Sequence, residues 1–341
     1  MTRALVTGAT GFLGTALVKR LVARGRTDLR CLVRERSDVS HLDAVLSKHP
    51  NVERFVGSLA SVEAAAAAVS GCDTIFHVAA AMRGTPADIL VDTVDTTKNL
   101  CEAIGRTAPS RGDEPPLFVL VSSFGVYGVA DLPRGAVIDE STPLERKPAQ
   151  RDPYSQGKLR QENLCWEYHE KGAIRLVVAR PGVIYGPRGG AFSARVGLNL
   201  FGVFLHLGGR NVLPLTYVDN CAEAIALLGD APETAGHAYN IVDDELIDCA
   251  DYLRRYKQKV APIRSVSLPY PITMLLSHAV ERGHRASKGR LPAVFTPYKT
   301  ASTWKGSRFS NAKLKALGWR PLVSTDRGLE LTFEHLKARA S

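Results

Sequence analysis

The stretch of the chain that decides its fold is Thr7-Gly8-Ala9-Thr10-Gly11-Phe12-Leu13-Gly14. The apolar run Ala4-Leu5-Val6 precedes it, and a helical pattern that ends at Gly25 follows it. In such a strand–turn–helix the first glycine reverses the chain, the second lets backbone approach a pyrophosphate, and the third lets the helix lie close to the strand. Phosphates would bind the free N–H groups at the helix N-terminus. The spacing alone predicts either a dinucleotide site or a plain strand-to-helix turn.

Strands and helices alternate along the first half of the chain. We predict strands at 29–33, 52–56, 74–78, 117–121 and 176–179, with helices near 38–48, 61–70, 88–107 and 153–171. This rhythm predicts an α/β fold with a doubly wound parallel sheet. After Ala179 irregular, partly helical pieces are expected, and then a helix at 217–228 and a strand at 236–242. We expect a dinucleotide-binding domain at 1–182, to which 214–242 returns, and a smaller, mostly helical substrate lobe from 183–213 and 243–341.

Length and composition set the broad class of the protein. The chain has 341 residues, 45% of them apolar, which is ordinary for a globular protein. The first strand begins almost at Met1 and no apolar run approaches the roughly 20 residues of a membrane span, so we expect a cytoplasmic protein without a membrane span. The six cysteines are scattered, which predicts reduced, buried thiols and no metal site.

Positive charge is concentrated in one segment. The net charge is +10, and between Tyr252 and Arg320 only Glu281 opposes Arg254, Arg255, Lys257, Lys259, Arg264, Arg282, Arg285, Lys288, Arg290, Lys299, Lys305, Arg308, Lys313, Lys315 and Arg320. Such a surface would attract an anionic ligand, nucleic acid or an acidic membrane, or be simply a solvated face. No nucleic-acid motif is present, so we expect no nucleic-acid partner. The apolar segment Ile272 to Val280 could touch a membrane or a greasy substrate, although we favour a core helix.

Three further groups of residues carry possible chemistry. Arg34 stands where an NAD enzyme usually has an acid, and arginine can pair with a 2′-phosphate, so NADP(H) is favoured and NAD(H) stays possible. Tyr154 and Lys158 share one face of a predicted helix, where the ammonium would lower the tyrosine pKa. Ser123 follows a buried strand, where its hydroxyl could bond a reacting oxygen. Taken singly, these could be loop charges, a surface helix pair and a turn-capping serine.

Together the motifs resemble the extended short-chain dehydrogenase/reductase family, which has a Rossmann-type fold. The resemblance covers nearly the whole chain and rests on Thr7 to Gly14, Ser123 four residues before Tyr127, Tyr154 with Lys158, Arg180 to Pro187, Tyr217 to Asn220, and Tyr239 to Ile241. The second lobe is similar to the branch that contains 3β-hydroxysteroid dehydrogenases and bacterial ketoreductases, through 268–271, 310–313 and 317–321.

The resemblance implies roles for individual residues. Ser123 would orient the substrate oxygen, Tyr154 would be the acid–base, and Lys158 would hold the nicotinamide ribose. The cofactor would lie against Gly8, Thr10, Gly11, Phe12, Leu13, Gly14, Arg34, Ser58, Leu59, Val78, Ala79, Ala80, Val121, Tyr154, Lys158, Pro181, Gly182 and Val183. Ser58 and Thr93 depart from the family's usual aspartate and asparagine, which puts those two contacts in doubt.

Three functions remain open on the sequence. The first is an NADP(H)-dependent oxidoreductase that interconverts a secondary alcohol and a ketone on a bulky, largely apolar small-molecule substrate. The second is a nucleotide-sugar epimerase with tightly bound NAD, although Pro214-Leu215-Thr216 stand where such enzymes often have an arginine. The third is a dinucleotide-sensing binding protein, which would have no need of Ser123, Tyr154 and Lys158 together. The family resemblance further implies a homodimer formed through the helices at 88–107 and 153–171.

Overall fold

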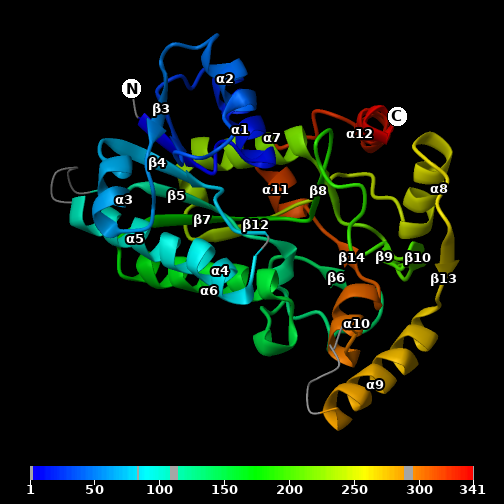
Figure 1. Ribbon diagram of the computed structural model, residues 1–341. Coiled ribbons are helices and arrows are strands. Elements are labelled where there is room, and N and C mark those ends of the chain that lie inside the picture. Colours follow the sequence, from blue (N-terminus) through cyan, green and yellow to red (C-terminus); the bar gives the residue numbers. More distant parts are fainter. Residues whose placement is uncertain (1–2, 83, 108–113, 288–294, 341) are drawn as a thin grey trace.

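A sheet of seven parallel strands forms the centre of the computed structural model, which describes residues 3–82, 84–107, 114–287 and 295–340 (Figure 1). The strand order is β12-β7-β5-β4-β1-β2-β3. The strands are β1 (Arg3–Thr7), β2 (Leu29–Val33), β3 (Val52–Val56), β4 (Cys72–His77), β5 (Leu117–Val121), β7 (Arg175–Pro181) and β12 (His237–Ile241). The chain winds outward from β1 in both directions, so the predicted doubly wound α/β fold is confirmed.

Helices cover both faces of this sheet (Figure 1). On one face lie α1 (Phe12–Ala23), α2 (Ser40–Leu46) and α7 (Val218–Asp230), and on the other α3 (Val62–Val69), α5 (Thr96–Thr107) and α6 (Pro153–Glu170). Side chains of a strand point alternately to the two faces, so Val119 packs in the core under α1 and α7 whereas Phe118 and Leu120 pack under α3 and α5. The central strand β5 is apolar throughout because both of its faces are buried, whereas the edge strand β3 contains Glu53 and Arg54 and is partly exposed.

The turn between β1 and α1 depends on two glycines. Gly8 has a φ of +69°, in the left-handed region that favours glycine. A Cβ on Gly14 would lie 2.0 Å from the carbonyl oxygen of Gly8. The first turn of α1 therefore rests directly on the backbone of the turn that precedes it.

The helix expected at 88–107 is divided. It consists of α4 (Pro86–Leu90), the π-helical turn η1 (Val91–Asp95) and α5. Thr85 and Asp88 form a capping box at its start. Gly157 of α6 lies against it, because a Cβ there would be 3.3 Å from Ile89 Cγ2. The π turn changes which side chains of this helix face α6, and the sequence pattern does not indicate it.

The segment after β7 contains strands instead of the expected irregular, partly helical pieces. The strand β8 (Val183–Tyr185) pairs with β11 (Leu215–Tyr217), and β9 (Gly197–Leu200) forms an antiparallel hairpin with β10 (Val203–His206), which also pairs with β13 (Ser265–Ser267). Phe201 and Gly202 form the hairpin turn with φ values of +50° and +80°. Two left-handed residues match the twist of a two-residue hairpin.

The remaining C-terminal elements are mostly helical, as predicted. They are α8 (Cys249–Lys259), α9 (Tyr270–Ala286), α10 (Pro297–Trp304), α11 (Ala312–Ala316) and α12 (Thr325–Ala340). The short strand β14 (Arg308–Phe309) pairs with β6 (Val137–Ile138), and the 3₁₀ turns are η3 (Phe124–Val126), η4 (Pro148–Gln150) and η5 (Pro232–Thr234). Leu314, Trp319 and Phe333 share one apolar core with α1 and α7, so the C-terminal part is anchored on the main sheet.

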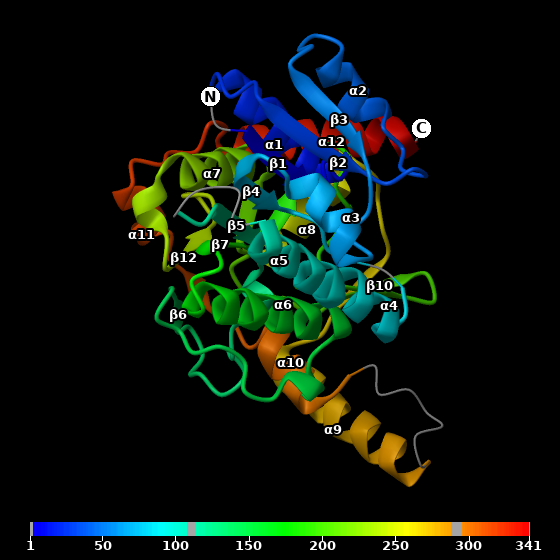
Figure 2. The same cartoon turned by 90° about the vertical axis from the view of Figure 1, so that its left-hand side faces the viewer.

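Helix α9 is not the core helix that the sequence favours. Figure 2 shows it extending away from the body of the protein. Ile272, Leu275 and Leu276 are exposed, whereas Thr273 and Ser277 are buried. The Ser277 and Thr300 hydroxyls lie 2.5 Å apart, so α9 packs on α10 through small polar residues and its apolar side chains face outward.

In the folded structure, acids from other parts of the chain compensate some of the positive charge of the basic segment. Four of its side chains pair with acids that precede or follow the segment: Arg254 with Asp251, Arg255 with Asp326 at 2.6 Å, Lys315 with Asp244 at 2.9 Å and Lys259 with Glu330 at 3.9 Å. Lys288 and Arg290 lie outside the described residues. These pairs favour the interpretation as a solvated face. Among the helices that the structure describes, none has the length and hydropathy needed to cross a membrane.

We predict that Gly14→Ala destabilises the protein, because its Cβ would meet the Gly8 carbonyl at 2.0 Å and backbone would have to move. Overpacking of this kind costs about 1–3 kcal/mol or more. Gly105→Ala in α5 is the control, since its Cβ would meet no heavy atom of the described residues within 4 Å and alanine favours a helix by about 1 kcal/mol. Urea unfolding followed by circular dichroism measures both. Equal stability of Gly14→Ala and wild type would contradict the proposed close packing.

Candidate active site

The predicted catalytic residues lie at the carboxyl edge of the sheet. Ser123 follows β5, and Tyr154 lies in the first turn of α6, whose N-cap Asp152 accepts a hydrogen bond from Ser155 N at 2.9 Å. Ser123 and Tyr154 are hydrogen-bonded to each other through their side chains. A Cβ on Gly125 would lie 2.8 Å from Ser155 Oγ, so the turn after Ser123 packs directly against the first turn of α6.

The pKa of Tyr154 is raised, where the sequence analysis expects a lowered value. Burial raises this pKa, and the hydrogen bond with Ser123 offsets the rise only in part. The Lys158 ammonium donates to Val121 O at 2.7 Å and to Gln161 Oε1 at 2.9 Å. With its charge directed to these oxygens, Lys158 does not compensate for the burial of the phenol. Tyr154 is therefore a neutral phenol at pH 7.

Lys158 belongs to a buried polar network that the sequence analysis missed. Gln161 donates to Thr97 Oγ1 at 2.8 Å, and His77 lies 2.8 Å from both Thr97 Oγ1 and Thr7 Oγ1. Thr97 also donates to the Thr93 carbonyl at 2.6 Å, and the Gln161 amide nitrogen lies 3.2 Å from His77 Nε2. The network connects the lysine to the last residue before the glycine turn.

Burial makes the charge of Lys158 easy to lose. It lowers the pKa of Lys158 to about 8, and burial together with the nearby ammonium lowers the pKa of His77 to about 3. His77 is therefore neutral at pH 7, and Lys158 is protonated but close to titration. Two features of the sequence could have indicated this network. Gln161 lies one helical turn after Lys158, and His77 lies at the end of an apolar strand.

A second buried network holds α6 on the sheet. Glu162 accepts from Ser122 Oγ at 2.5 Å and from Arg180 Nε at 3.2 Å, and Arg180 also donates to Tyr127 Oη at 2.9 Å. Tyr127 in turn donates to Asn240 Oδ1 at 2.7 Å. Burial alone would lower the pKa of Arg180, but Glu162 more than offsets it and raises that pKa. The ends of β5, β7 and β12 are thereby joined to α6.

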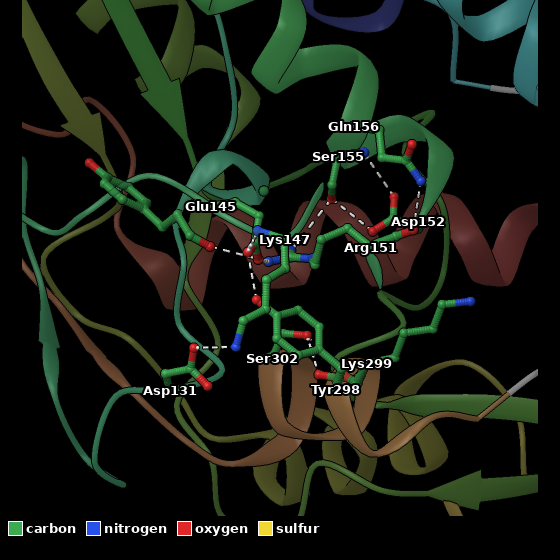
Figure 3. A network of polar contacts seen from close by, with 12 residues as sticks. Asp131, Glu145, Lys147, Arg151, Asp152, Ser155, Gln156, Tyr298, Lys299 and Ser302 are labelled. Carbon is green, nitrogen blue, oxygen red and sulfur yellow. Dashed lines mark hydrogen bonds and ion pairs between the residues drawn. The ribbon is translucent and has the colours of Figure 1, made fainter. Parts of the chain in front are cut away.

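A third network joins the first turn of α6 to α10 (Figure 3). Glu145 accepts from Tyr298 Oη at 2.5 Å and from Arg151 Nη1 at 3.2 Å. Arg151 also lies 3.5 Å from Ser155 Oγ, which donates to Asp152 Oδ2 at 2.7 Å. Residues next to Tyr154 are thus tied to a helix of the C-terminal lobe.

The glycine turn fits a dinucleotide pyrophosphate. A Cβ on Gly11 would contact only the Gly8 oxygen, at 3.2 Å, among the described residues, so its outer side is open. The first turn of α1 consists of the uncharged residues Phe12 to Thr15 and can offer its N–H groups to phosphate oxygens. Thr10 lies within this turn, and Val78, Ala79 and Ala80 follow β4 beside it, where Ala79 N donates to Thr7 Oγ1 at 3.2 Å.

The other predicted cofactor contacts lie around this turn. Arg34 is exposed at the end of β2, with its guanidinium 4.0 Å from Asp92. Ser58 and Leu59 follow the neighbouring strand β3. Gly182 N donates to Ile241 O at 3.0 Å and Val183 N to Pro214 O at 2.6 Å, so the N–H groups of this segment already have backbone partners.

The C-terminal lobe contains a large cavity of about 640 Å³. Its wall includes the rings of Phe192, Phe204 and Tyr256, and the side chains of Ser123 and Tyr154 do not line it. Closer to Ser123, the ring of Phe124 stacks on that of Phe309 with centroids 5.4 Å apart. Among the described residues, no group of three or more metal-ligating side chains comes together.

Comparison with known proteins identifies the family. Residues 4–242 match the model of the NAD dependent epimerase/dehydratase family. The chain is 28% identical to cinnamoyl-CoA reductase 1 of Arabidopsis thaliana, over 98% of this chain and 89% of that protein. It is also 28% identical to the decarboxylating sterol-4-alpha-carboxylate 3-dehydrogenase of Bos taurus, over 98% and 93% of the two chains.

A solved structure shows the same fold. UDP-glucuronic acid 4-epimerase from Bacillus cereus, in complex with UDP-glucuronic acid and NAD, superposes with a TM-score of 0.70 at 20% identity, over 99% of this chain and 100% of that one. The matched residues hold the glycine turn, Ser123, Tyr154 and Lys158, and the relatives by sequence are reductases and dehydrogenases, in agreement with the predicted oxidoreductase class. The chain belongs to the NAD dependent epimerase/dehydratase family, within the extended short-chain dehydrogenases/reductases that its motifs predicted.

Proposed function

We propose that this protein is an NADP(H)-dependent oxidoreductase that interconverts a secondary alcohol and a ketone on a bulky, largely apolar substrate. The observation that carries the proposal is the pair formed by Ser123 and the neutral phenol of Tyr154, with the Lys158 ammonium one helical turn away. A phenol that keeps its proton at pH 7 is suited to protonate a carbonyl oxygen.

Each side chain of the site has its own role in the reaction. When bound, the nicotinamide supplies or accepts the hydride. Ser123 donates a hydrogen bond to the carbonyl oxygen, and Tyr154 transfers its proton to that oxygen as negative charge develops there. The ammonium of Lys158 then stabilises the phenolate. In the opposite direction, the phenolate removes the proton of the alcohol.

One observation supports an apolar substrate. The half-buried ring of Phe309 stacks on that of Phe124, the residue after Ser123. Sterol and 3-beta-hydroxysteroid dehydrogenases among the relatives agree with this class. We further infer a cytoplasmic homodimer formed through α5 and α6, as the family resemblance implies.

The alternative function is a nucleotide-sugar epimerase with tightly bound NAD. The fold shared with UDP-glucuronic acid 4-epimerase favours it. Against it, Pro214-Leu215-Thr216 provide no cation before Tyr217 to bind a diphosphate. An epimerase of this kind retains NAD during purification, which the absorbance spectrum of the purified protein would reveal.

Cofactor choice is expected to depend on Arg34. Arg34→Asp should weaken NADPH binding by at least tenfold and leave NADH binding nearly unchanged, because a charge-assisted hydrogen bond is worth about 1.5–3 kcal/mol. Fluorescence titration measures both affinities, and Arg36→Asp is the matched control with the same charge change two residues away. Wild-type protein that binds NADH as tightly as NADPH would contradict the assignment.

Replacing Tyr154 should stop the chemical step. Tyr154→Phe keeps the ring and removes the proton donor, so turnover should fall by about 10²–10⁴-fold while NADPH still binds. Ser123→Ala should cost less, at most about 3–4 kcal/mol for one oxyanion donor. Tyr168→Phe, on the same helix, controls for the loss of a phenol. Stopped-flow oxidation of NADPH measures the step, and near-normal turnover in Tyr154→Phe would assign proton transfer to another group.

The pH profile should report Lys158. Its pKa of about 8 predicts that kcat/KM falls above about pH 8, as the ammonium loses its proton. Gln161→Glu should move this fall to higher pH, because a neighbouring carboxylate favours the ammonium, and Gln161→Leu should move it to lower pH. The exposed Gln150, changed in the same two ways, is the control. Alkaline limbs that coincide in all variants would show that the network does not set this pKa.

A further inference from the structure

The backbone around Arg195 is held firmly in the loop between β8 and β9. Arg195 N donates to Ser193 Oγ at 3.2 Å, and Arg195 O accepts from Cys249 Sγ at 3.4 Å. Trp304 Nε1 donates to Ala194 O at 3.1 Å. Helices α8 and α10 thus fix the position from which this side chain extends.

The Arg195 guanidinium faces the two segments that carry the reacting groups. Its Cζ lies 5.9 Å from the centroid of the Phe309 ring, which stacks on Phe124, the residue after Ser123. On its other side, its charge interacts with Arg151 and Asp152, which come just before Tyr154. The cation therefore lies near the two segments that hold Ser123 and Tyr154, with Phe309 between it and Phe124.

This guanidinium has no counter-ion in the part of the chain that the structure describes, nor any hydrogen bond there. The buried arginines nearby are paired, Arg151 with Glu145 and Arg180 with Glu162. Burial and the charge of Arg151 lower the pKa of Arg195 to about 10, which shows how unfavourable its surroundings are for a cation. The Arg195 side chain is half-buried, and no acid of the described residues compensates its charge. Clefts that bind charged ligands are where proteins keep such a cation.

We propose that Arg195 binds an oxyanion group of the substrate, a carboxylate or a phosphate, beside the reacting carbonyl. The planar fork of guanidinium donors matches such a group with two parallel hydrogen bonds. The inference rests on the proposed function and narrows its substrate class to carbonyl compounds that carry both an apolar frame and an anionic group. The half-buried ring of Phe309 then contacts the frame while Arg195 fixes its orientation.

Calorimetric titration of the whole protein tests this inference. The protein is titrated in the presence of NADPH with two anions, benzoate and phenyl phosphate, and with the neutral benzamide. Wild type should bind at least one of the two anions, and the better one identifies the group. Arg195→Met should weaken that anion by at least tenfold, and Arg195→Lys, which keeps the charge without the fork, should fall between. Arg210→Met removes an exposed charge from the same lobe and should bind the anion as wild type does. Benzamide should not distinguish the four proteins.

Two results would overturn the inference: no measurable binding of either anion to wild type, or equal anion affinity in wild type and both Arg195 variants. If Arg195→Met loses the circular dichroism signal of the folded protein, the anion affinities of wild type and Arg195→Lys are compared instead. The result is separable from the proposed function, because the titration measures binding alone. Arg195-dependent anion binding in a protein that fails to oxidise NADPH would refute the oxidoreductase, and NADPH-dependent reduction without anion binding would refute only the subsite.

Discussion

The Glu162 carboxylate is buried where β5 and β7 end, and the position of the whole site depends on its contacts with Ser122 and Arg180. Leaving a buried charge of this kind without its partner typically costs about 3–5 kcal/mol, so α6 cannot slide or rotate without losing the pair. Tyr154 and Lys158 lie two turns and one turn before Glu162 on the same helix. One ion pair thereby sets the depth and rotation at which the phenol and the ammonium meet the end of β5.

The two functional halves of the site are supported from different sides. Lys158, Gln161, Thr97 and His77 extend inward to Thr7, so the proposed acid–base pair and the glycine turn share one rigid, buried support. The substrate side is held from the C-terminal lobe by Tyr298 on Glu145 and by Trp304 behind Arg195. This arrangement lets the lobe vary for a particular substrate while the chemistry beneath it stays unchanged, a common feature of this fold class.

The charges of the site differ in how they are compensated. Arg151 and Arg180 form ion pairs with acids, whereas the Lys158 ammonium donates hydrogen bonds to two neutral oxygens and Arg195 has no acid partner among the described residues. Both of the latter cations have lowered pKa values for the same reason, desolvation. In our proposals, Lys158 gains the ribose hydroxyls of the bound cofactor and the phenolate that forms on Tyr154 during the reaction, and Arg195 gains a substrate oxyanion. A cation without an acid partner gains more from binding an anionic group than a cation that already forms an ion pair.

The sequence by itself determined the features that depend on local chemistry. The glycine spacing from Gly8 to Gly14, the buried strands and the N-cap at Asp152 follow from backbone geometry and from periodicity within a few residues, and they sufficed for the fold and the family. The tertiary structure alone decided that burial raises the Tyr154 pKa, that Gln161 and His77 support Lys158, and that α9 turns its apolar side chains outward. It also decided that Arg195 lies over Phe309 without an acid partner among the described residues. Each of these features depends on desolvation or on contacts between segments far apart in the chain. The residues next to a position in the sequence do not reveal either of them.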